Sequence, residues 1–111
     1  MNEQEEKIAF PHQEVIEYYE IDIDELPRNS RELIQSLEER ISKLSSMEDG
    51  DEKVNELRDI GKKSNMFAAT IIDQNKKTDS EKERKEIENE IKDSVVSIKE
   101  EIKRIEQEQE E

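Results

Sequence analysis

Apolar residues recur at steps of three and four along three stretches of the chain. The first stretch follows Pro27 and carries Leu33, Ile34, Leu37, Ile41, Leu44 and Met47. Such spacing gathers its members on one arc of a helical wheel, so the pattern predicts a helix over about residues 30–47. Asn29 and Glu32 stand three residues apart at its start, which is the spacing of a capping box.

The second stretch lies beyond Gly50, which we expect to form the turn. Its apolar and small residues again share one arc, and they are Val54, Leu57, Ile60, Gly61, Ser64, Phe67, Ala68, Ile71 and Ile72. The pattern predicts a helix over about residues 52–75. Gly61, Ser64 and Ala68 run down the centre of this face, and such small side chains permit a neighbouring helix to approach closely. Met66 points to the opposite side.

The third stretch is the narrowest. It consists of Ile87, Ile91, Val95, Ile98, Ile102 and Ile105, which predict a helix over about residues 79–106. A stripe this narrow is typical of a coiled-coil seam. Thr78 and Glu81 have capping-box spacing at its start. Val96 falls opposite the stripe, and the tail after Ile105 has nothing to bury, so we expect the tail to fray.

Residues 1–28 are ambiguous. The segment YEIDID alternates apolar and acidic residues like a strand, whereas Ile16, Tyr19, Ile23 and Leu26 recur at helical steps. We favour a short helix from about Pro11 to Glu20 and then an extended segment, because no second strand pattern exists to pair with the first. We divide the chain into this acidic N-terminal segment and a helical bundle over residues 29–111.

Three helices joined by two short turns predict an all-α fold, an antiparallel three-helix bundle with coiled-coil character. A single helix from residue 52 to 110 is the main alternative. The absence of apolar residues between Ile72 and Ile87 favours a turn there. Only 30% of the residues are apolar, and a core this thin favours a homo-oligomer, such as a dimer. Either the N-terminal segment covers Met66, or Met66 contacts another molecule.

Charge narrows the choice of partner. Charged residues make up 45% of the chain and the formal net charge is −14. A field of that sign repels nucleic acid and anionic membranes, so we expect a basic protein partner. The N-terminus lacks the pattern of a secretory signal, and no run approaches the roughly 18 apolar residues of a membrane span. We therefore expect a soluble cytoplasmic protein.

The charges of the third predicted helix are segregated. The acids Asp79, Glu83, Glu86, Glu90, Asp93, Glu101 and Glu108 lie on one flank of the isoleucine stripe, and Lys85, Lys92, Lys99 and Lys103 lie on the other. The commoner interpretation is a solvated face. The sharper one is a row of carboxylates, one helical turn apart, that imitates the phosphates of a nucleic acid and enters a basic groove.

Residues suited to catalysis are scarce. His12 is the only histidine, there is no cysteine, and Gly50 and Gly61 are the only glycines, so no phosphate-binding loop exists. We expect His12 on the surface and no base beside any serine or threonine. The acids near Asp22 and those of residues 48–52 lack the spacing of a calcium-binding hand. We therefore expect no enzyme activity, no cofactor and no metal site.

The leading hypothesis is a non-enzymatic, acidic helical binding protein that occludes a basic surface of its partner. Inhibitors, immunity proteins and antitoxins of phages and other mobile elements act in this way. An adaptor, such as a secretion-type chaperone or an assembly subunit that pairs through the isoleucine seam, is the alternative. The candidate partner-binding residues are Asp79, Glu83, Glu86, Glu90, Asp93, Met66 and Val96.

Overall fold

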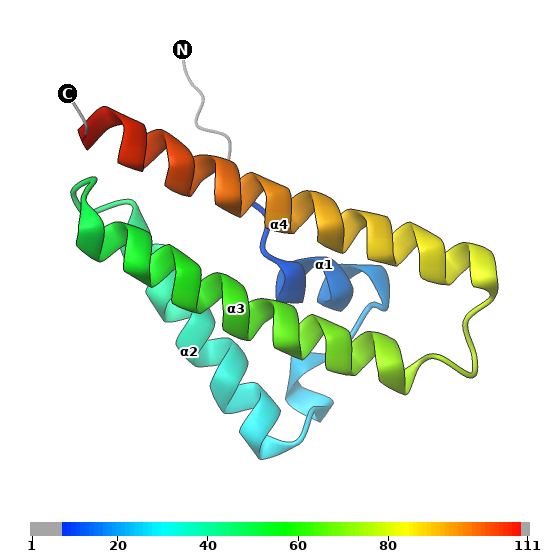
Figure 1. Cartoon of the computed structure of the whole chain (residues 1–111). Helices are drawn as coiled ribbons and strands as arrows, with labels where there is room; N and C mark the ends of the chain where they lie inside the picture. Colours follow the sequence, from blue (N-terminus) through cyan, green and yellow to red (C-terminus); the bar gives the residue numbers. More distant parts are fainter. Residues whose placement is uncertain (1–7, 110–111) are drawn as a thin grey trace, which may run out of the picture.

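The computed structural model describes residues 8–109 and is all helical over that range (Figure 1). Its α-helices are α1 (Pro11–Tyr18), α2 (Arg28–Leu44), α3 (Asp51–Gln74) and α4 (Glu81–Gln109), with a short 3-10 turn, η1 (Ile23–Glu25), between α1 and α2. The described residues contain no strand, so the short helix expected from about Pro11 to Glu20 is confirmed, although it ends at Tyr18, and the strand alternative for residues 19–24 was wrong. The extended segment expected after the helix is interrupted by η1. No helix in this range is both long and apolar enough to cross a membrane.

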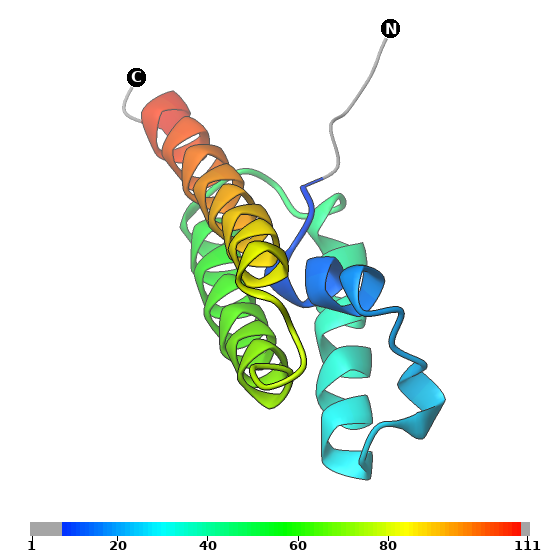
Figure 2. The same cartoon turned by 90° about the vertical axis from the view of Figure 1, so that its right-hand side faces the viewer.

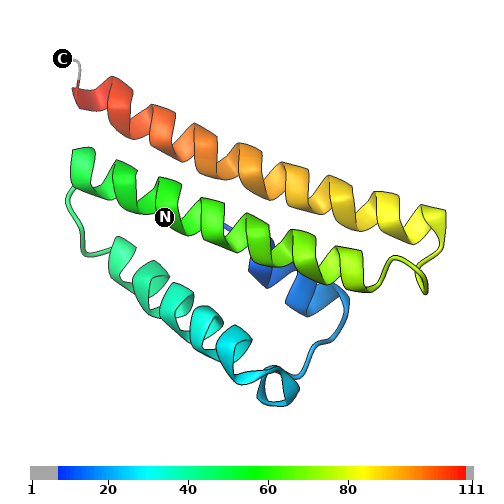
Figure 3. The same ribbon diagram turned by 60° about the horizontal axis from the view of Figure 1, so that its bottom comes forward.

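The two long helices, α3 and α4, lie side by side and antiparallel (Figure 1). Helix α2 meets α3 near the turn that joins them and then diverges from it, as Figure 3 shows. Figure 2 shows α1 in the wedge that this divergence opens, against the pair formed by α3 and α4. The closest helix contacts are accordingly those of α3 with α4 and of α1 with both of them.

The expected three-helix arrangement is not confirmed, because the N-terminal segment takes a place in the core. Phe10 and Val15 are almost completely buried, at 1% and 0% exposure. Pro11 occupies the first turn of α1, where its fixed φ suits a helix and its missing N–H costs nothing. Phe10 at the N-cap of α1 and Val15 within α1 thus pack into the core between the other helices.

The core consists of two apolar clusters. The first contains Phe10, Leu37, Leu44, Val54, Leu57, Ile60, Ile98, Ile102 and Ile105. The second contains Val15, Ile34, Phe67, Ala68, Ile71 and Ile87. Four isoleucines of the predicted seam, Ile87, Ile98, Ile102 and Ile105, are therefore buried within this chain.

Neither predicted capping box forms. Helix α2 begins one residue before Asn29, with no side-chain cap, and Arg28 instead pairs with Glu32 at 3.0 Å. At the start of α4 the box is shifted by two residues. The Ser80 N–H donates to the Glu83 carboxylate (2.9 Å), and the Glu83 N–H donates to the Ser80 hydroxyl (3.1 Å). The same type of signal occurs twice in this segment, and only the packing of α4 chooses between them.

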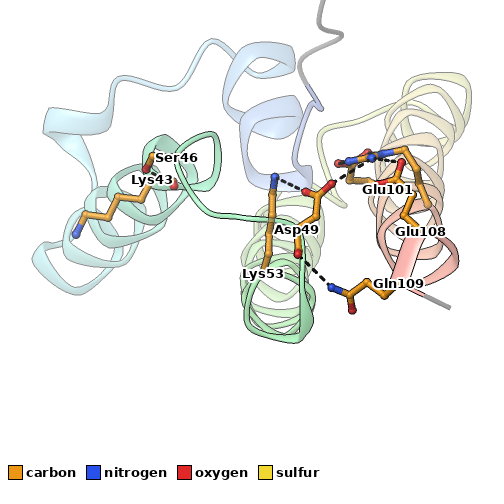
Figure 4. Close-up of polar contacts among 8 residues, drawn as sticks. Lys43, Ser46, Asp49, Lys53, Glu101, Glu108 and Gln109 are labelled. Atoms are coloured by element: carbon orange, nitrogen blue, oxygen red, sulfur yellow. Dashed lines mark hydrogen bonds and ion pairs between the residues drawn. The ribbon is translucent and has the colours of Figure 1, made fainter. Parts of the chain in front are cut away.

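The end of α4 is tied to the turn between α2 and α3 (Figure 4). Arg104 pairs with Glu101 (2.6 Å), Glu108 (2.9 Å) and Asp49 (3.4 Å). The Gln109 side chain donates to the backbone carbonyl of Asp49 at 3.1 Å. The predicted fraying after Ile105 is therefore not seen up to Gln109, and the last two residues of the tail lie outside the described range, as do residues 1–7.

Candidate functional site

Helix α1 brings a second set of carboxylates beside the acidic flank of α4. The pKa of Glu14 is raised above its usual value. Burial is the largest cause, and the charges of Glu90, Glu17 and Asp93 follow. Only carboxylates that lie close together have this effect on one another. We call the surface formed by Glu14, Glu17, Glu86, Glu90 and Asp93 the acidic ridge.

The acidic ridge is not neutralised by neighbouring cations. None of its five carboxylates has an ion-pair partner among residues 8–109, although Arg40 and Arg104 each pair with several carboxylates elsewhere. Glu14 is half-buried, and Glu17, Glu86, Glu90 and Asp93 are exposed. The ridge is thus a concentrated negative charge that is open to solvent, suited to attracting a cationic surface.

Two tyrosines fix the position of α1 against the beginning of α4. The Tyr18 hydroxyl lies 3.1 Å from the backbone carbonyl of Glu83 and 3.4 Å from the Glu86 carboxylate. The Tyr19 hydroxyl donates to Asp79 at 2.6 Å, and burial together with this bond raises the pKa of Tyr19. These contacts hold the two rows of acids of the ridge in register.

The predicted acidic residues are divided by these contacts. Asp79 lies in the segment before α4, half-buried and bonded to Tyr19, and so does not extend the helical row. Glu83 belongs to the capping box, where bonds from Ser80 hold its pKa below the usual value. Glu83, Glu86, Glu90 and Asp93 are all exposed on α4, and the last three take no part in its cap. The sequence pattern did not reveal Glu14 and Glu17, because only the tertiary structure places α1 beside this part of α4.

Met66 and Val96 lie apart from the acidic ridge. They are the exposed large apolar side chains of the described range, at 61% and 45%. Met66 lines a hollow of about 480 Å³ together with Leu26, Pro27 and Leu33, at the side where α2 begins. Residues 8–28 of the N-terminal segment therefore leave Met66 exposed, although Leu26 and Pro27 of this segment line the same hollow. Val96 lies on α4, opposite its buried stripe.

His12 is not a surface residue, contrary to expectation. Its ring is fully buried, with Nδ1 2.6 Å from Ser64 Oγ and Nε2 2.7 Å from the Glu38 carboxylate. Glu38 also accepts a bond from the Gln13 side chain at 2.9 Å. An ionised carboxylate only accepts hydrogen bonds, so we assign the proton to Nε2, which leaves Nδ1 to accept from the Ser64 hydroxyl.

The Ser64, His12 and Glu38 side chains resemble a hydrolytic triad only in their chemical types. Ser64 is fully buried, and its oxygen already accepts the backbone N–H of His12 at 2.7 Å while its hydroxyl faces Nδ1. A nucleophile needs access to the substrate, which Ser64 lacks. We assign this network to the packing of α1 on α3 and α2, and the small Ser64 is what permits that close approach.

Among residues 8–109, the acidic ridge included, no group of three His, Cys, Asp or Glu side chains is placed to hold a metal ion. The ridge thus has the chemistry of an electrostatic contact surface. In comparisons with protein families, with curated proteins and with solved structures, this chain matches none.

Proposed function

We propose that this protein is a non-enzymatic binding protein that occludes a basic surface of a partner protein through its acidic ridge. The observation that carries the proposal is the convergence of α1 and α4 acids that have no ion-pair partner among residues 8–109. The pKa of Glu14 is raised first by burial and then by the charges of Glu90, Glu17 and Asp93, so these neighbouring charges add to the cost of ionising Glu14 in the folded protein. A cationic partner would relieve this repulsion on binding.

The geometry of the ridge supports a nucleic-acid-mimicking form of this function. Glu86, Glu90 and Asp93 follow one another at steps of four and three on α4, so they stand about one turn, or ~5 Å, apart along the helix. Helices present these charges on a rigid backbone, which avoids the entropic cost of ordering a flexible acidic segment on binding. A groove that accepts a row of phosphates would suit such a row of carboxylates.

The experiment uses the partner itself. Affinity capture from the native host with the wild-type protein as bait identifies candidates, and surface plasmon resonance then measures the association rate of each purified candidate. We expect the combined variant Glu86→Gln, Glu90→Gln, Asp93→Asn to lower that rate at least tenfold. We also expect the wild-type rate to fall steeply as salt is raised, because screening shortens the range of the attraction.

The control variant removes the same number of charges elsewhere. Glu39→Gln, Glu48→Gln and Glu52→Gln alter exposed carboxylates that have no ion-pair partner among residues 8–109. We leave Glu83 unchanged in both variants, because it caps α4. Equal association rates for the two variants would show that only net charge matters and would remove the ridge from the proposal.

The second candidate is an adaptor that pairs with other helices, or a homodimer. Burial of Ile87, Ile98, Ile102 and Ile105 inside the chain leaves less of the seam for such pairing. Met66 and its hollow remain the feature that favours this candidate. Light scattering at high micromolar concentration distinguishes a monomer from a dimer, because a mass of 13.2 kDa corresponds to a monomer. A dimer that Met66→Glu dissociates would place the adaptor first.

A further inference from the structure

A groove runs between α3 and α4, and its lining residues come from these two helices and the turn after α3, with none from α1. It consists of two hollows, of about 590 and 400 Å³, which are continuous at Asn65. The first extends toward Arg58 and Glu106, and the second toward Lys76 and Arg84. From Arg58 to Asp73 the groove follows α3 for about 23 Å, and Lys76 lies in the turn after this helix.

The floor of the groove is apolar and partly open. Its residues are Gly61, Ala69, Ile72, Ile91, Val95, Ile98 and Ile102. Gly61 has no side chain to project into the middle of the groove. A Cβ at this position would lie 3.4 Å from the Ile98 side chain. Ala69 is exposed, and Ile72, Ile91 and Val95 are half-buried. This strip of apolar surface lies along the whole groove.

The rim of the groove is basic, although the protein as a whole is strongly acidic. Six cationic side chains line it, Arg58, Lys62, Lys76, Arg84, Lys99 and Lys103, against the three acids Asp73, Glu88 and Glu106. The groove therefore carries a local net charge of +3 within a chain of −14. Lys62, Lys76, Lys99 and Lys103 have no ion-pair partner among residues 8–109. The lysine flank of α4 thus joins the cations of α3 at one surface.

We propose that this groove binds an amphipathic helix of a partner protein, with the apolar face of that helix on the floor and its acidic flanks against the lysines. The length fits, since about 23 Å corresponds to about 15 helical residues, or four turns. The charge is complementary, and apolar floors with charged rims are typical of helix-in-groove recognition. A second copy of this chain suits the groove less well, because the apolar side of its own acidic helix, α4, is buried.

A pair of designed peptides tests the proposal. Each is a fluorescently labelled 18-residue helix with the same leucine stripe, flanked in one by glutamates and in the other by lysines. Fluorescence anisotropy measures the affinities, and amide NMR shifts locate the site. We expect the glutamate peptide to bind at α3 and α4 at least tenfold more tightly than the lysine peptide. Because the lysine peptide can also bind the acidic ridge, only binding that the NMR shifts place in the groove counts. Binding of neither peptide there at millimolar concentration, or equal binding of both there, would overturn the proposal.

Two variants separate the contributions of rim and floor. Lys62→Glu with Lys99→Glu and Lys103→Glu should weaken the glutamate peptide at least tenfold, whereas Lys43→Glu with Lys77→Glu and Lys82→Glu, equally charged but outside the groove, should change it less than threefold. Ala69→Arg blocks the floor while adding a positive charge. It should weaken binding, and stronger binding would show that charge alone acts and would overturn the helix-in-groove proposal.

Two further results would also overturn the proposal. One is tighter binding of a labelled single-stranded oligonucleotide than of the glutamate peptide, at equal salt. The other is a dimer in light scattering that Ala69→Arg dissociates, because a second copy would then occupy the groove. Circular dichroism of each variant verifies that its helices are intact. The acidic ridge is unchanged in all of them, so failure here leaves the proposed function standing.

Discussion

The backbone N–H and the ring Nδ1 of His12 both lie within hydrogen-bond distance of the Ser64 hydroxyl oxygen, at 2.7 and 2.6 Å. This one oxygen joins the first turn of α1 to the middle of α3, 52 residues later. His12 and Ser64 come between members of the two apolar clusters along their respective helices. The polar pair therefore fixes how deeply α1 enters the wedge, a position that apolar contacts alone would specify less sharply.

Replacing Ser64 with alanine should destabilise the protein. The buried N–H and Nδ1 of His12 would lose their partner, and we expect a cost of about 1–3 kcal/mol in the free energy of unfolding, measured by urea titration with circular dichroism. Ser97→Ala alters an exposed serine of α4 and should change that free energy by less than ~0.5 kcal/mol. Equal stability of the two variants would contradict the role assigned to Ser64.

Acidification should weaken the fold through His12. Burial lowers the pKa of His12 below 6.5 in the folded protein, against the opposing effect of Glu38. The unfolded chain then binds more protons just below pH 6.5, so the stability due to His12 is complete above that pH and is lost as the pH falls through the folded pKa. Urea titrations between pH 7.5 and 5.5 measure this loss.

Two variants assign this pH dependence to His12. His12→Gln should remove the loss, whereas Glu38→Gln should enlarge it, because the carboxylate that favours the charged ring is then absent. An unchanged slope in a folded His12→Gln variant would trace the effect to other groups.

Glu14→Gln should stabilise the protein at neutral pH. The pKa of Glu14 is raised in the folded state, so this group favours folding less as the pH rises from its unfolded pKa through its folded pKa. Removing the charge should raise the melting temperature by roughly 1–3 °C at pH 7 and have little effect near pH 4. A lower melting temperature at pH 7 would contradict the unfavourable environment assigned to the Glu14 carboxylate. Differential scanning calorimetry at both pH values tests this.

Gly61→Ala should also stabilise the protein. Gly61 lies inside α3, where glycine costs about 0.5–1 kcal/mol relative to alanine. A Cβ there would meet only Ile98, at 3.4 Å, which is an ordinary contact. We expect a gain of about that size in the free energy of unfolding. A loss would mean that α4 packs on Gly61 more tightly than these distances indicate.

Arg40→Lys tests the clamp between α2 and α3. Arg40 donates two bonds to Glu56, each of 2.8 Å, and lies 2.9 Å from Asp59. Lysine cannot form this fork, and because the pair is about a quarter exposed we expect a cost of roughly 1 kcal/mol. Arg28→Lys, at the exposed pair with Glu32, should cost less than ~0.5 kcal/mol. Thermal unfolding of the two variants supplies the comparison.

The sequence by itself determined the helices. Steps of three and four in the apolar pattern located α2, α3 and α4 to within three residues at each end, because helix formation depends on local spacing. The pattern also identified Glu86, Glu90 and Asp93 as one row, since residues at such steps share a helix face. Met66 and Val96 could be recognised as exposed from the sequence, because they lie on the side of their helices opposite the apolar residues.

Only the tertiary structure decided what α1 does. Its short apolar pattern did not reveal that Phe10 and Val15 fill the wedge beside α3 and α4, because that wedge exists only after α2 diverges. The burial of His12 against Ser64, the addition of Glu14 to the acidic ridge, and the union of Lys62 with Lys99 in one groove all join residues far apart in the chain. Helical periodicity is a local property, whereas these pairs depend on how whole helices pack against one another.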